Sequence, residues 1–178
     1  SIIINILLST FNSINSVIVF QTIFLCAAII FFARTISVQF NLSLVPKIFV
    51  AIFLFLPTIK FYNYLLTEPL SFALSLLFIS FIIKLIYNFK FLNLVLSALF
   101  IIALLLVRKQ FIILYPLILI IYIGIFMAHT SKKTFILLSI SFMSIFIIHN
   151  SLLFFSKYKN NYPITNFEES LTADSIAA

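Results

Sequence analysis

One short stretch places a carboxylic acid beside amide and ring side chains in an otherwise apolar sequence. Asn63 and Tyr64 precede Glu68, which is followed by Pro69, and no other acid occurs among the first 167 residues. A carboxylate near a membrane is costly without a partner, so Glu68 is a candidate to bind a sugar hydroxyl, an amine or a divalent metal ion. Asn63 and Tyr64 would add hydrogen bonds and a stacking ring. The alternative is a helix-capping acid next to an interfacial aromatic belt.

A second stretch places two cations side by side between apolar runs. Arg108, Lys109 and Gln110 follow one run, and Tyr115-Pro116 lies soon after the start of the next. A guanidinium fork and an ammonium point charge are well suited to hold a phosphate, here a lipid phosphate. The alternative is a plain turn whose charges stop translocation of the chain. The sequence therefore predicts either a phosphate site or a turn at this junction.

The composition decides which kind of fold must position these residues. Hydrophobic residues make up 64% of the chain and charged residues 8%, whereas soluble domains carry about 25% charged residues. So few charges cannot cover a water-soluble surface. In lipid every backbone polar group needs an internal partner, which only helices and closed barrels provide. Continuous apolar runs of about 20 residues favour helices over strands of alternating polarity. We therefore predict an all-α, polytopic transmembrane bundle.

The apolar runs divide the chain into about six spanning helices. The region 1–155 is the predicted membrane domain, and the polar region 156–178, which holds three of the four acids, is a loop or the start of an extramembrane segment. The expected spans are about 14–33, 46–66, 69–87, 91–107, 111–128 and 135–155.

The net charge of +7 comes from basic residues at the ends of the apolar runs. Such a distribution orients membrane proteins and argues against nucleic-acid binding. We expect the loops around 34–47, 84–90 and 129–133 to be cytoplasmic. Glu68 and the pair Arg108–Lys109 then share the outer side.

Other polar residues within the apolar runs carry less chemistry. Cys26 is the single cysteine, so no intrachain disulfide forms, and His129 and His149 do not have the spacing of a metal site. We expect His149 to be interfacial and Gln21 to hydrogen-bond between helices. With one glycine in the chain, glycine-rich nucleotide-binding loops are excluded.

The sequence around Glu68 and Arg108 resembles the GT-C superfamily of polytopic glycosyltransferases. The residues concerned are Leu66-Thr67-Glu68-Pro69-Leu70 and, two spans later, Leu105-Leu106-Val107-Arg108-Lys109-Gln110. The closest types are the bacterial relatives of dolichyl-phosphate-mannose protein mannosyltransferases and the aminoarabinose transferase of lipid A. In these families a Thr-Glu-Pro motif starts a helix on the outer face, and a later basic motif lies near the lipid phosphate.

The resemblance implies transfer of a sugar from a polyprenyl phosphate to an acceptor at the outer face of a bacterial inner (plasma) membrane. Glu68, with Asn63 and Tyr64, would position sugar, acceptor or metal. Arg108, Lys109 and Gln110 would hold the lipid phosphate. The main catalytic acid of the family lies in its first loop, and no acid precedes Glu68 here. We therefore expect this chain to be a piece of a longer protein, with its catalytic residues elsewhere.

Two other functions stay open from the sequence. A transporter or flippase for a lipid or small solute would also use polar residues within spans, and it would move its substrate without breaking a bond. A non-catalytic membrane subunit would tolerate substitution of the polar residues.

Overall fold

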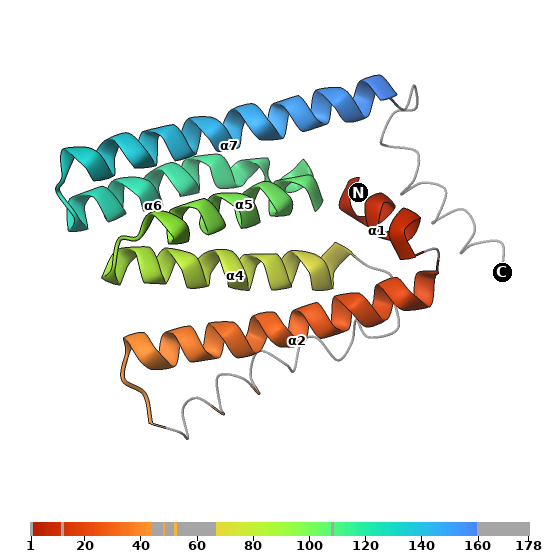
Figure 1. The fold of residues 1–178 in the computed structure, drawn as a ribbon, viewed down its shortest axis with the longest axis horizontal. Helices are drawn as coiled ribbons and strands as arrows, with labels where there is room; N and C mark the ends of the chain where they lie inside the picture. Colours follow the sequence, from red (N-terminus) through yellow and green to blue (C-terminus); the bar gives the residue numbers. More distant parts are fainter. Residues whose placement is uncertain are drawn as a thin grey trace.

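The chain folds into an all-α bundle, which confirms the predicted fold class. The computed structural model describes residues 2–11, 13–43, 48, 52, 67–107 and 109–159. Figure 1 shows the helices side by side. The expected span 46–66 lies outside the described residues, except for residues 48 and 52. The helices are α1 (Ile2–Phe11), α2 (Ile14–Gln39), α4 (Thr67–Tyr87), α5 (Phe91–Val107), the 3₁₀ helix η2 (Lys109–Ile113), α6 (Leu114–Ala128) and α7 (Lys132–Lys159).

Among the residues that the structure describes, four helical segments are long and apolar enough to cross a membrane, judged by length and composition. They are Ile14–Gln39, Glu68–Tyr87, Phe111–Ala128 and Lys132–Phe155. Helix α5 is apolar too, but it is shorter, with 17 residues. The expected polar segment that begins at residue 156 starts within α7, which continues to Lys159. The chain therefore has the helical character of a membrane protein.

Helix α4 occupies the middle of the bundle. In its most apolar stretch 56% of the residues are buried, against 17% in the corresponding stretches of α6 and α7. Helices α2 and α4 run in the same direction, and α5 returns antiparallel beside α4 (Figure 1). Helix α7 packs against α5 and α6. The outer helices expose apolar side chains, as lipid-facing helices do.

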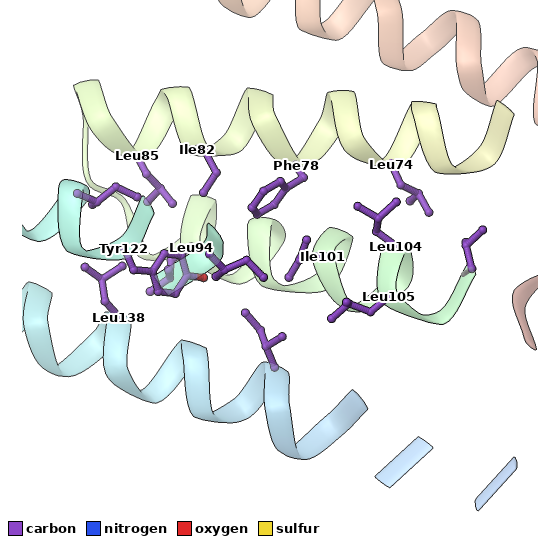
Figure 2. Packing of buried hydrophobic residues seen from close by; sticks show 14 of the residues in the cluster. Leu74, Phe78, Ile82, Leu85, Leu94, Ile101, Leu104, Leu105, Tyr122 and Leu138 are labelled. Carbon is purple, nitrogen blue, oxygen red and sulfur yellow. The ribbon is translucent and has the colours of Figure 1, made fainter. Parts of the chain in front are cut away.

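The main core lies between α4 and α5 and extends to α6 and α7. Figure 2 shows Leu74, Phe78 and Ile82 of α4 directed toward Leu94, Ile101 and Leu104 of α5. These positions recur every three or four residues, so each helix presents one stripe to the other. Because lipid is as apolar as leucine, close packing in this stripe is a main force that holds the helices together.

Small side chains let α2 and α4 approach closely. Ala28 of α2 and Ala73 of α4 are 1% and 0% exposed and belong to one cluster. Ser71 is buried, whereas Ser75 is half-buried and donates its hydroxyl hydrogen bond to the Ser71 carbonyl at 2.8 Å. The interface thus uses single small residues rather than a glycine motif.

Helix α2 continues to Gln39, beyond the expected end of the span at residue 33. It ends where Asn41 adopts a left-handed backbone conformation, with φ of 49°. The N–H of Leu42 then donates to the carbonyl of Ser37 at 3.0 Å. Asparagine tolerates this conformation, and the six-to-one hydrogen bond is that of a Schellman helix end. The polar residues that follow Arg34 are therefore helical as far as Gln39.

A polar contact lies inside the bundle and joins three helices. The hydroxyl of Tyr122 on α6 lies 3.0 Å from the hydroxyl of Ser141 on α7 and is also close enough to interact with the hydroxyl of Ser97 on α5. All three residues are buried. Since lipid offers no hydrogen-bond partner, these hydroxyls fix the relative rotation of α5, α6 and α7.

We expect Tyr122→Phe to lower the free energy of unfolding by about 0.6–1.5 kcal/mol, the range measured for hydrogen bonds between membrane helices. Unfolding by SDS in mixed micelles, followed by circular dichroism, measures this loss. Tyr87→Phe is the matched control, because Tyr87 is 52% exposed at the end of α4. Equal stability of the two variants would show that the buried hydroxyl contributes nothing.

Candidate functional site

Glu68 lies in the first turn of α4, one residue after the helix begins at Thr67. The sequence placed Pro69 at the first helical position, and the structure places it third. Proline is tolerated there because the N–H groups of the first turn have no partner within the helix. The Glu68 side chain is half-buried, and its Oε2 atom is buried. The carboxylate therefore sits at the positive end of the α4 dipole, largely shielded by protein.

Polar residues of α2 and α4 lie level with this end of the bundle. Phe31 of α2 contacts Phe81 of α4 with ring centroids 5.3 Å apart. Because the two helices run in the same direction, this register places Gln21 level with Ser71. Gln21 is 2% exposed, and it continues the stripe of α2 that packs on α4. Its burial agrees with the expected interhelical position.

The α5–η2 junction carries the second candidate group. Helix α5 ends at Val107, the chain tightens into a 3₁₀ helix from Lys109, and α6 begins at Leu114. Arg108 lies outside the described residues, as do the side chains of Lys109 and Gln110. The backbone nevertheless positions this junction. The start of α4 and the end of α5 lie at the same end of the bundle, near α1 (Figure 1).

The fold thus brings the Glu68 end of α4 and the Lys109 junction to one end, as the alternation of spans predicts. Asn63 and Tyr64 lie outside the described residues. No group of three or more His, Cys, Asp or Glu side chains that could hold a metal ion occurs within the described residues. A divalent metal at Glu68 would therefore need ligands from a substrate or from residues beyond the described ones.

His149 is a polar residue of this end that the sequence placed at the membrane interface. It is instead 4% exposed, in the last part of α7. Its Nδ1 atom lies 2.7 Å from the hydroxyl of Tyr115 on α6, and the ring is also close enough to interact with the backbone of Leu105 on α5. A carbonyl only accepts, so the ring donates to Leu105 and the tyrosine hydroxyl donates to Nδ1.

This histidine supports the helix break that precedes the basic residues. Leu105 is among the last four residues of α5, whose carbonyls have no partner within the helix. Such carbonyls need a donor where lipid replaces water. His149 supplies one, and it ties α7 to both sides of the α5–η2–α6 junction. One feature of the sequence could have indicated this role of His149. It is a polar residue within an apolar helix, in a chain that also contains a helix break.

His129 does the same for α4 at the opposite end. Its Nε2 atom lies 2.9 Å from both the Leu85 and the Ile86 carbonyl oxygens, in the last turn of α4. The ring also lies beside Phe89, with centroids 5.9 Å apart. Both histidines of the chain thus cap the carboxyl end of a neighbouring helix. Both rings therefore have a structural role at a helix end.

Comparisons with known proteins find no family model, curated protein or solved structure that matches this chain. The candidate site consists of two features at the same end of an apolar bundle. One is the shielded carboxylate of Glu68 at the start of α4, and the other is the basic α5–η2 junction, beside which His149 packs.

Proposed function

We propose that this chain is a membrane segment of a GT-C-like glycosyltransferase that uses a polyprenyl-phosphate sugar as its donor. One observation supports the proposal most. The shielded Glu68 carboxylate and the α5–η2 junction, which carries Arg108 and Lys109, lie at one end of a bundle that is otherwise apolar. A donor with a sugar, a phosphate and a long lipid chain needs these three surroundings together.

The proposed reaction breaks the bond between the sugar's anomeric carbon and the phosphate oxygen. The acceptor hydroxyl oxygen attacks that carbon, its proton passes to a base, and the bonding electrons leave with the polyprenyl phosphate. Arg108 and Lys109 would hold the departing phosphate, with Gln110 beside them. Glu68 would orient the sugar or acceptor by accepting hydrogen bonds from hydroxyl groups. The resemblance assigns the base to an acid in the first loop of the family.

Support for a cellular location comes from the charges at the two ends. At the end opposite Glu68 lie the loops with Lys90, Lys132 and Lys133, together with the basic carboxyl-terminal parts of α2 and α4. An excess of cations marks cytoplasmic loops. We therefore propose that the chain resides in a bacterial inner membrane, with the Glu68 end on the outer face.

The full-length protein in proteoliposomes tests the proposal. The donors are undecaprenyl-phosphate mannose and undecaprenyl-phosphate aminoarabinose, and the acceptors are a Ser/Thr-rich peptide and lipid A. Mass spectrometry measures the free undecaprenyl phosphate and the glycosylated acceptor. We expect release that depends on protein and acceptor for one donor. Movement of an intact donor across the bilayer would indicate the flippase instead. If neither transfer nor movement is observed, the non-catalytic subunit is the remaining function.

A further inference from the structure

A second polar feature lies at the other end of the bundle, between α2 and α4. The Lys84 ammonium of α4 lies 4.0 Å from the ring centroid of Phe31 on α2 and 5.1 Å from that of Phe81. The two rings also contact each other, at 5.3 Å. A cation over two aromatic faces is held in place by their quadrupoles. The ammonium is therefore fixed over the junction of the two helices.

Arg34 brings a second cation to the same place. It follows Phe31 by three residues on α2, which puts both side chains on one face of that helix. Arg34 is exposed, Lys84 is half-buried, and the two are close enough to repel each other electrostatically. Two neighbouring positive charges repel each other, and an anion between them offsets this repulsion.

The chain itself supplies no anion within reach in its first 167 residues. Glu68 is the only acid there. It lies at the other end of α4 from Lys84, sixteen residues away in the same helix, or about 24 Å at 1.5 Å per residue. Among the described residues, no acid therefore lies beside Arg34 and Lys84.

The positions of Arg34 and Lys84 along their helices indicate which kind of anion would pair with them. Lys84 precedes the end of α4 at Tyr87 by three residues, or about 5 Å, and Arg34 precedes the end of α2 at Gln39 by about 8 Å. Long basic side chains at this depth extend toward the headgroups. At the headgroup level of a bilayer, the anion that such side chains meet is the phosphate of a lipid.

We infer that Arg34 and Lys84 form a binding site for the phosphate of one anionic phospholipid, whose acyl chains lie along α2 and α4. The arginine fork would take two phosphate oxygens, and the ammonium, held by Phe31 and Phe81, a third. Basic pockets between membrane helices on the cytoplasmic side bind anionic headgroups in this way. The site is independent of the proposed transferase chemistry, which lies at the opposite end.

The test is a lipid titration of the purified full-length protein, observed by native mass spectrometry in neutral detergent. The probes are phosphatidylglycerol and phosphatidylcholine in about 0.15 M ammonium acetate, where surface charges are screened beyond about 8 Å. We expect one phosphatidylglycerol to bind more tightly than phosphatidylcholine. The double variant Arg34→Gln/Lys84→Gln should bind it about tenfold more weakly or worse.

Lys132→Gln/Lys133→Gln is the matched control. It removes the same charge from the same end, from two exposed side chains of α7 rather than of α2 and α4, and should lower affinity by less than about twofold. Phe31→Leu removes the ring beneath the ammonium and should weaken binding about two- to fivefold. Lys84→Arg should restore most of the affinity, and circular dichroism melts verify that each variant folds.

Three results would overturn the lipid site. Equal losses in the two double variants would show diffuse charge attraction, and no loss in either would show that the cations do not bind phosphate. Competition by glycerol 1-phosphate at the same affinity as the lipid would assign the site to a soluble phosphate.

Discussion

Glu68→Gln in the full-length protein is expected to lower the release of polyprenyl phosphate about a hundredfold. The proposed carboxylate accepts hydrogen bonds from substrate hydroxyls, and glutamine replaces one acceptor oxygen by a donor amide. Misplacement of the reacting atoms by about 1 Å lowers the rate by about a hundredfold. Steady-state kinetics with the undecaprenyl-phosphate donors measure the change. A positioning role lowers kcat more than it raises KM, whereas a purely structural acid would change the unfolding midpoint instead.

Three further variants sharpen this result. Glu68→Asp keeps the charge and should recover part of the rate. Arg108→Ala should raise KM for the donor and lower kcat, because the phosphate loses a bidentate partner. Lys133 lies at the opposite end of the bundle, so Lys133→Ala should leave kcat and KM unchanged. Full turnover by both Glu68→Gln and Arg108→Ala would remove these residues from the proposed reaction.

His149→Ala is expected to lower the free energy of unfolding by about 2 kcal/mol. The substitution leaves the Leu105 carbonyl and the Tyr115 hydroxyl without the ring that now bonds both. A buried polar group that loses its partner costs about 1–3 kcal/mol. Unfolding in SDS mixed micelles, followed by circular dichroism, measures the loss.

Two controls isolate the hydrogen bonds of this histidine. Asn150→Ala changes an exposed neighbour whose side chain bonds only within its own helix, at 2.7 Å to the Phe146 carbonyl, and should have little effect. Tyr115→Phe removes one of the two bonds of the histidine and should cost about half as much. A His149→Ala variant as stable as Asn150→Ala would show that the helix break holds without its donor.

Much of the helical layout could be predicted from hydrophobicity alone. Each apolar run that falls on described residues coincides with a helix, because lipid leaves the backbone no other way to satisfy its hydrogen bonds. The end of α2 at Gln39 was missed since Arg34 and the polar residues after it resemble a loop. Its actual stop depends on one residue, Asn41, in a left-handed conformation.

The structural roles of the histidines could not be predicted from the sequence. His149 and Tyr115 are 34 residues apart, and His129 and Leu85 are 44 apart. Such pairs depend on the rotation and axial register of packed helices, which a hydrophobic pattern on single helices does not specify. The same holds for Lys84 and Phe31. Of the candidate site, the sequence identified Glu68 and the junction at 108–110, whose polar residues stand out from apolar surroundings.

The unequal lengths of the helices bear on the kind of bilayer that suits this protein. Helix α2 has 26 residues, about 39 Å, whereas α5 has 17, about 26 Å. Helix α5 can be shorter than a typical 30 Å hydrocarbon layer because α4 and α7 cover much of its surface. Helix α2 can adapt by tilting. Lipid acyl-chain length should therefore affect α2 more than α5, so that a change in bilayer thickness acts first on the α2–α4 contact.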